Sequence, residues 1–237
     1  MVQNPGGSSS HVLVCDHAGG DIPLRLGRLG LGDSDLARHI ALDIGAGAVA
    51  SRIGELLDAA VVRQVYSRLV IDCNRPLEAE SLIPEISDGA IIPGNLGLTA
   101  EARLERIEAI FAPYHHAIAG LIETRLAARR RVAVVSVHSF TPVMDGLRRP
   151  WDFGVLHASD SPLSTRMLGL LRAEEGLVIG DNEPYALGGL DYTVPHHAQE
   201  RGLDYLELEI RQDLIDTPDG QERIAARIAR LLAACRD

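Results

Sequence analysis

Polar and ionisable side chains gather in this sequence at or near the ends of apolar segments. Four apolar segments carry such side chains. They are His17 after residues 11–15, Asn74 and Arg75 after residues 68–73, His138 at the end of residues 131–138, and Glu207, Glu209 and Arg211 within residues 203–211. In an open α/β sheet, ligands bind at the carboxyl ends of the strands. Any one of these residues alone could have a structural role, but structural roles do not predict that all four groups share one edge.

These residue types suit metal-assisted hydrolysis of an amide. Two neutral imidazoles and a carboxylate are ligands that Zn²⁺ prefers, and three protein ligands leave a position for water. Zinc lowers the pKa of that water to about 7 and polarises a carbonyl group. A further carboxylate can carry the proton from water to the leaving amine, and an arginine can bind a substrate carboxylate in bidentate fashion. The sequence contains no HExxH, GxSxG or P-loop motif, which argues against those other kinds of site.

The elements that must position these residues read as an α/β protein. Short, apolar, β-branched segments predict strands at residues 11–15, 60–64, 68–73, 131–138 and 152–158, and residues 203–211 alternate between apolar and polar. Helical spacing predicts helices at residues 34–58, 99–130, 161–175 and 219–236, with Pro113 kinking or splitting the second. Strands alternating with helices predict a sheet covered on both faces, and residues 76–98 read as a long ordered loop.

Length and composition fit one enzyme-sized domain. The chain has 237 residues, of which 46% are hydrophobic, and we expect an extended or disordered tail over residues 1–10 and one domain over residues 11–237. A net charge of -10 argues against nucleic acid as a partner. The three cysteines form no CxxC pair, and no signal peptide or membrane span is evident, so we expect a cytoplasmic protein.

Several motifs in order resemble the N-formylglutamate amidohydrolase family, which is related to zinc carboxypeptidases, aspartoacylase and succinylglutamate desuccinylase. The motifs cover roughly residues 11–215 and read CDHAGGDIP, SRLVIDCNRP, IPGNLGLT, VHSF, RRPWDFGVL, DNEPY and HHAQERGLDYLELEIRQDLI. The resemblance implies a three-layer α/β/α fold with a mixed, mostly parallel sheet. It also implies a zinc-dependent amidohydrolase of histidine degradation and amino-acid metabolism that converts N-formyl-L-glutamate to formate and glutamate.

The resemblance implies His17 and His138 as zinc ligands, together with an acidic residue shortly after His17. We expect Asp21 to be that ligand because it is the only carboxylate in HAGGDIP, with Asp72 as an alternative. Two positions depart from the related patterns: glycine occupies position 20, where the carboxypeptidase spacing places an acid, and serine occupies position 136, where relatives carry a supporting acid. Fe²⁺, Co²⁺ or Mn²⁺ would suit similar ligands.

The remaining roles also come from the resemblance. Glu209 corresponds to the general base, with Glu207 as the alternative, and Arg75 with Asn74 corresponds to the carboxylate clamp. Lesser candidates for substrate contact are Arg149, Tyr185 and His197, and we expect packing roles for His115, His116, His157, Asp43 and Asp152.

Two other functions stay open at this point. The substrate of such a hydrolase could be another N-acyl amino acid or a short peptide. The departures at Gly20 and Ser136 instead favour a non-catalytic module that binds a small molecule on the same fold. Oligomerisation is compatible with either function.

Overall fold

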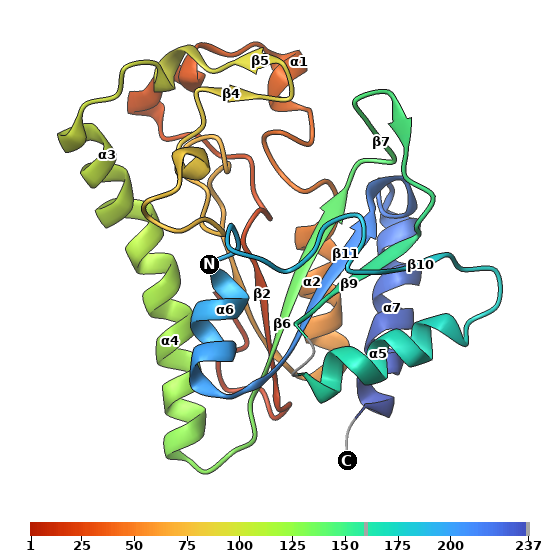
Figure 1. Cartoon of the computed structure of the whole chain (residues 1–237). Helices are drawn as coiled ribbons and strands as arrows, with labels where there is room; N and C mark the ends of the chain where they lie inside the picture. The colour runs from red at the N-terminus through yellow and green to blue at the C-terminus, as the bar shows by residue number, and fades with distance from the viewer. Residues whose placement is uncertain (159–160, 236–237) are drawn as a thin grey trace.

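A computed structural model describes residues 1–158 and 161–235 (Figure 1). Its strands are β1 (Val2–Gln3), β2 (His11–Cys15), β3 (Ala60–Arg63), β4 (Ile86–Ser87), β5 (Ala90–Ile91), β6 (Ala133–Phe140), β7 (Val143–Met144), β8 (Leu147–Arg148), β9 (Phe153–Leu156), β10 (Ile179–Asp181) and β11 (Asp204–Arg211). Its α-helices are α1 (Asp33–Leu36), α2 (Ala46–Leu57), α3 (Ala100–Arg106), α4 (Ala112–Ala127), α5 (Pro162–Arg172), α6 (Thr193–His197) and α7 (Pro218–Ala234). Short 3₁₀ helices span Leu24–Gly30, Glu80–Leu82, Pro93–Asn95, Gln199–Arg201 and Gln212–Leu214, and Ile107–Phe111 is π-helical.

Seven strands form one mixed sheet in the order β1-β3-β2-β6-β11-β9-β10. Strands β3, β2, β6 and β11 run parallel, whereas β9 is antiparallel to β11 and β1 is antiparallel to β3. The prediction of a mixed, mostly parallel sheet flanked by helices is therefore confirmed. Strand β1 lies within the first ten residues and pairs with β3, so part of that segment is an extended edge strand.

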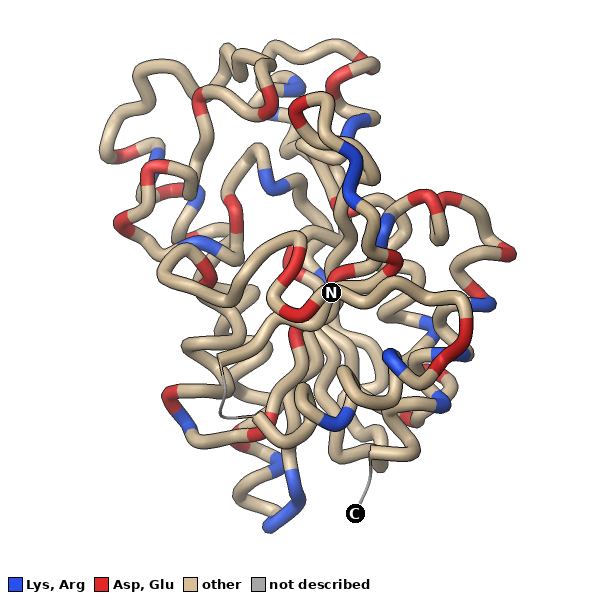
Figure 2. Tube along the Cα trace, turned by 45° about the vertical axis from the view of Figure 1, so that its right-hand side comes forward, with Lys and Arg blue, Asp and Glu red and all other residues tan. Residues whose placement is uncertain are grey.

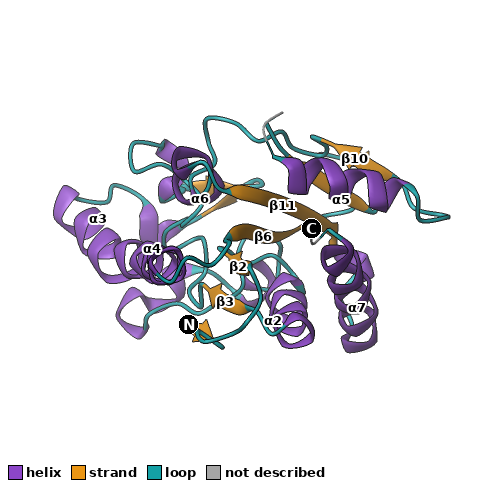
Figure 3. Cartoon of the chain, turned by 90° about the horizontal axis from the view of Figure 1, so that it is seen from below, coloured by secondary structure: helices purple, strands orange, loops and turns teal. Residues whose placement is uncertain are grey.

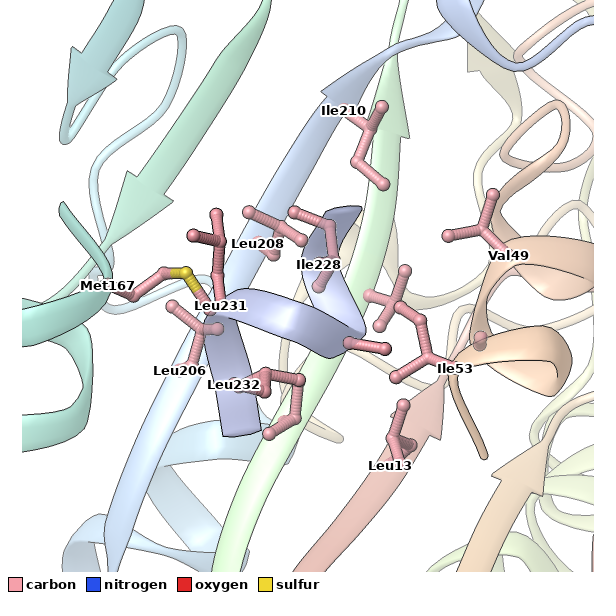
Figure 4. Close-up of a cluster of buried hydrophobic side chains, with 14 of the residues drawn as sticks. Leu13, Val49, Ile53, Met167, Leu206, Leu208, Ile210, Ile228, Leu231 and Leu232 are labelled. Atoms are coloured by element: carbon pink, nitrogen blue, oxygen red, sulfur yellow. The ribbon is translucent and has the colours of Figure 1, made fainter. Parts of the chain in front are cut away.

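Helices cover both faces of the sheet (Figure 3). On one face, α2, α5 and α7 pack on alternate residues of the strands, including Leu13, Leu206 and Leu208 (Figure 4). On the other face, α4 and α6 pack on a second cluster that contains Val12, Val134 and residues of the loops. Alternation along each strand therefore decides which polar side chains lie on the second face, because neighbouring residues point to opposite sides.

Two predicted elements are wrong. Residues 68–73 form turns rather than a strand; Leu69, Val70 and Ile71 are buried in the second cluster without strand pairing, and apolar spacing alone does not separate these outcomes. The helix predicted over residues 34–58 is interrupted between α1 and α2. Gly45, at the start of α2, has a φ of 79°, and a Cβ there would lie 2.2 Å from the carbonyl oxygen of Ile215.

The helical stretch over residues 99–130 is continuous from α3 through the π-helical turn to α4. Pro113 lies just after the π-helical turn Ile107–Phe111, so the regular α-helical hydrogen bonding is altered next to the residue that has no N–H to donate. The segment 76–98 contains the small β4–β5 hairpin, which lies above the carboxyl ends of the central strands in Figure 1.

Charged residues of both signs are interspersed along the chain trace (Figure 2). None of the helices in residues 1–158 and 161–235 combines the length and the apolar character that crossing a bilayer requires.

Candidate metal centre and active site

Two imidazoles and a carboxylate converge at the carboxyl end of the sheet. Asp43 Oδ2 lies 2.9 Å from His138 Nδ1 and 3.4 Å from His17 Nδ1, and the three groups can offer ligand atoms within 4.8 Å of one another. All three side chains are buried. This His17–Asp43–His138 group has the composition of a three-ligand transition-metal site.

Each member is positioned by a different part of the fold. His17 follows the end of β2, and His138 lies near the end of the neighbouring β6. Asp43 comes from the segment between α1 and α2, where its backbone N–H donates to the carbonyl of His17 at 2.9 Å. That backbone hydrogen bond brings a residue 26 positions away in sequence to the first imidazole.

The second nitrogen of each imidazole is held by another polar group. His17 Nε2 lies 2.7 Å from Asp72 Oδ1. His138 Nε2 lies 3.0 Å from the hydroxyl of Ser136 and 3.3 Å from Asp16 Oδ2. Carboxylates behind ligating histidines fix the ring orientation and raise the basicity of the ligand. With Nε2–H donating to these partners, both Nδ1 lone pairs face Asp43, as metal ligation requires.

Asp16 supplies the supporting carboxylate that is missing at position 136. Although Ser136 is not an acid, Asp16 brings a carboxylate to the same nitrogen of His138 from the end of β2. The other oxygen of Asp16 accepts a hydrogen bond from the Thr193 hydroxyl at 2.7 Å. The supporting acid is thus supplied from elsewhere in the chain.

The charges of the group fit a divalent cation. Three buried carboxylates, Asp16, Asp43 and Asp72, surround the two imidazoles, and the guanidinium of Arg68 pairs with Asp43 and Asp72, which leaves two negative charges to balance. Burial opposes ionisation of Asp43, but His17 and His138 hold its pKa below the usual range, and Arg68 does the same for Asp72. Two imidazolium ions or one dication with neutral imidazoles would satisfy these charges, so the donor set fits a metal ion.

Glu207 and Glu209 lie beside this group on strand β11. The parallel register pairs Glu209 with His138 and Glu207 with Ser136, so all four side chains share the face that carries the second cluster. Both glutamates are buried, and the Oε2 atom of each has no hydrogen-bond partner among the described residues. Burial raises the pKa of Glu209 to about 7 and that of Glu207 to about 8. A carboxyl group with a pKa near neutrality can accept and return a proton.

A cavity of about 500 Å³ opens onto these groups. Its lining includes His17, Asp43, His138, Glu207 and Glu209. Gly154 on β9 lies opposite Glu209, and a Cβ at this glycine would lie 2.1 Å from the carbonyl oxygen of Glu183. The wall beside the glutamates therefore requires glycine.

Three residues expected at the substrate line the same cavity, namely Asn74, Arg75 and Tyr185. The Asn74 side-chain oxygen accepts from the backbone N–H groups of Tyr192 and Thr193. Arg75 Nη1 donates to the carbonyl oxygens of Asn74 and Leu190. Asn74 thus holds the segment that forms the cavity wall, while Arg75 lies on that wall.

Two other expected residues lie outside the lining. Arg149 stacks on the rings of Phe140 and Tyr185 and donates to the Tyr185 hydroxyl at 2.9 Å. His197 is 0% exposed, and its Nε2 lies 2.9 Å from His115 Nδ1. Arg149 therefore contacts the cavity residue Tyr185 without lining the cavity itself, and His197 forms a separate buried pair with His115.

Asp21 is not brought to the two imidazoles. Its backbone pairs with the segment around Tyr66, its side chain is exposed, and it is absent from the cavity lining. Asp43, for which the sequence favours a packing role, occupies the expected place of the acid. Asp43 reaches His17 and His138 because the chain folds back between α1 and α2. The sequence around Asp43 gives no indication of this long-range contact. The supporting acid Asp16 was not predicted either; its position next to His17 in the motif CDH is the one sequence feature that indicates it.

The sheet and the buried group define a mixed α/β protein with a candidate metal site at its carboxyl edge. Residues 9–216 match the family model described as N-formylglutamate amidohydrolase. The chain belongs to the N-formylglutamate amidohydrolase family, as its motifs indicate.

Two solved structures are similar over nearly the whole chain. The crystal structure of a gene product from Agrobacterium tumefaciens is 39% identical with a TM-score of 0.96, and the match covers 99% of this chain and 93% of that one. An N-formylglutamate amidohydrolase from Ralstonia eutropha JMP134 is 18% identical with a TM-score of 0.73, covering 99% and 95%, and supports the fold. A search of curated proteins found no significant match.

Proposed function

We propose that the protein is a metal-dependent hydrolase that cleaves the amide bond of an N-acyl amino acid. The observation that carries this proposal is the buried His17–Asp43–His138 group, which lines one cavity together with Glu209. N-formyl-L-glutamate, whose products are formate and glutamate, is the reference substrate because the family takes its name from it. Zinc is the preferred ion because nitrogen and carboxylate ligands suit it.

In this scheme, His17, His138 and Asp43 hold the ion, and Asp72 and Asp16 orient the two imidazoles. A divalent ion bound there would polarise the amide carbonyl and lower the pKa of water.

Glu209 moves the proton. Its carboxylate takes a proton from the attacking water, whose oxygen bonds to the carbonyl carbon. Glu209 then delivers that proton to the amide nitrogen as the C–N bond breaks, which yields a carboxylic acid and a free amine. The burial that raises its pKa to about 7 suits both halves of this transfer. Glu207 lies two residues before Glu209 on β11, opposite Ser136 rather than His138, and has the higher pKa, so it is the less suitable base.

Arg75 binds the substrate α-carboxylate. Nη1 is anchored by the carbonyl oxygens of Asn74 and Leu190, which fixes the plane of the guanidinium at the cavity wall. An oriented guanidinium binds a carboxylate with directional, charge-assisted hydrogen bonds.

The test is release of formate from a panel of N-formyl amino acids. Protein stripped of metal is assayed before and after loading with Zn²⁺, and metal-loaded Glu209→Gln protein is the matched control. We expect turnover that requires the ion and falls in the variant. Wild-type turnover no greater than that of Glu209→Gln on every substrate would refute hydrolysis and favour a binding module.

A further inference from the structure

Part of the cavity lining is apolar. Its volume of about 500 Å³ lies within the range of roughly 300–1,000 Å³ that is typical of sites for drug-sized ligands. Beyond the metal-site groups, the lining includes the large apolar side chains of Ile86, Phe140, Met144, Leu156 and Leu190. They come from segments well separated in sequence, so the apolar wall is a product of the fold.

Two of these side chains remain exposed at the mouth. Ile86, on strand β4, is 64% exposed, and Leu190, in the segment before α6, is 60% exposed. Single exposed apolar residues are common, but these two line the same cavity. An apolar group of a bound substrate would remove their surface from water, at roughly 25 cal/mol per Å².

Both arginines of the lining already have carboxylate partners. Arg68 donates to Asp72 through Nε and Nη2, and its Nη1 lies 3.5 Å from Asp43. Arg75 lies 3.6 Å from Asp191 and provides the one guanidinium that we assign to the substrate α-carboxylate. A second substrate carboxylate would therefore need a further cation.

The lining offers no such cation among the described residues. His39 lies 3.7 Å from Asp88, and burial lowers its pKa, which favours the neutral ring. Asp88 is itself paired with Arg38. A divalent ion would be balanced by the carboxylates around it and would add no excess positive charge to attract a dianion. Arg149 is a further guanidinium, but it stacks on the lining residues Phe140 and Tyr185 and lies outside the lining itself.

We propose that this cavity selects N-acyl amino acids that have a single carboxylate and an apolar side chain over N-formyl-L-glutamate. This inference rests on the proposed hydrolase function. The α-carboxylate binds Arg75, and the side chain lies against Ile86, Met144 and Leu190. The γ-carboxylate of glutamate would lose water there without gaining a cation, which costs free energy.

Three N-formyl substrates separate charge from apolarity: L-leucine, L-glutamine and L-glutamate derivatives. Zn²⁺-loaded protein should show the highest kcat/KM for N-formyl-L-leucine, and that value should exceed the one for N-formyl-L-glutamate by about tenfold or more. Glutamine matches glutamate in shape but lacks the charge, so its value should lie between them. A kcat/KM for N-formyl-L-glutamate equal to or above that for the leucine compound would overturn the proposal.

Two variants test the named residues. Ile86→Arg should raise kcat/KM for N-formyl-L-glutamate relative to N-formyl-L-leucine, because it supplies the missing cation at the mouth. Arg149→Ala should leave the ratio between the two substrates unchanged, because Arg149 lies outside the lining. A selective loss of the glutamate substrate in Arg149→Ala would show that Arg149 binds the second carboxylate, and the proposal would be wrong.

Calorimetric titration keeps this test separate from hydrolysis. Zn²⁺-loaded Glu209→Gln protein should bind N-formyl-L-leucine about tenfold more tightly than N-formyl-L-glutamate, even if the wild type hydrolyses neither. That outcome would reject the proposed reaction but retain the selectivity. Equal or reversed affinities, or no binding of either compound, would reject the selectivity itself.

Discussion

Two pairs of buried histidines lie on the same face of this fold, and their surroundings differ. His17 and His138 are surrounded by carboxylates on both ring nitrogens. His115 and His197 bond to each other, and His115 Nε2 lies 2.9 Å from the carbonyl oxygen of Cys73. Both pairs are buried, so burial alone does not distinguish a candidate ligand from a packing residue.

The surroundings set opposite protonation behaviour. Burial would lower the pKa of His138, but Asp16 and Asp43 hold it well above the ordinary value. Burial lowers the pKa of His115 to about 4 and that of His197 to about 3, so this pair stays neutral at physiological pH. Charged partners prepare the first pair for a cation, whereas the second pair lies in surroundings that favour neutral rings.

The largest effect should follow removal of the carboxylate between the first pair. Asp43→Ala deletes a proposed ligand, so the loss of metal affinity should exceed the ~10–100-fold that removal of an outer partner typically costs. Activity should fall to background, as measured by chelator competition and formate release. Asp21→Ala is the matched control, and we expect it to retain metal and activity; the reverse result would restore Asp21 as the ligand.

The next effect separates chemistry from metal binding. Glu209→Gln should lower kcat by about 10²–10⁴-fold, because the proton carrier is lost. Metal content, measured by elemental analysis, should stay at the wild-type level. Glu207→Gln should reduce kcat less, and a larger loss in that variant would make Glu207 the base.

The pH dependence follows from the same residue. Glu209 acts as a base only when ionised, and burial raises its pKa to about 7. Activity should therefore rise with pH up to about 7, and a bound cation would move that rise to lower pH. Measurement of kcat/KM between pH 5 and 9 checks this. A value that falls continuously as the pH rises from 5 to 7 would contradict the role of Glu209 as the base.

A smaller effect should follow loss of the carboxylate behind His138. Asp16→Asn removes the charge that lies 3.3 Å from His138 Nε2, and metal affinity should fall by about 10–100-fold. Chelator competition measures it. The double variant Asp16→Asn with Ser136→Asp should recover part of the affinity, whereas a destabilised fold would not be rescued in this way.

The smallest effect on the metal should come from the second pair. His197→Leu leaves His115 Nδ1 without its partner, and the free energy of unfolding should fall by about 1–3 kcal/mol. Urea denaturation measures that loss, and metal affinity should not change. A rise in KM at constant stability would instead support the substrate contact predicted for His197.

The sequence predicted more of the strands than of the loops. The strands predicted at residues 11–15 and 131–138 correspond to β2 and to most of β6, because fully buried parallel strands read as continuous apolar runs. The run at residues 68–73 is equally apolar but packs in turns, since tertiary contacts override local preference. The break before Gly45 likewise depends on a close approach to Ile215, far away in sequence.

The residues of the candidate site differ in the same way: some follow from local sequence patterns, and others depend on long-range contacts. His17, His138 and Glu209 follow from strand ends and strand alternation, both of which are local properties. Asp43 was missed because its place depends on the path of the chain between α1 and α2. Packing decides which acid meets the imidazoles, and sequence spacing pointed to Asp21 instead.

Anomalous diffraction at the zinc edge from zinc-loaded crystals would locate the ion and identify its ligands. We expect one ion bound by Nδ1 of His17, Nδ1 of His138 and a carboxylate oxygen of Asp43, at metal–ligand distances of about 2.0–2.2 Å. An ion coordinated by Asp21, or zinc-loaded crystals with no anomalous peak between the two imidazoles, would contradict this assignment.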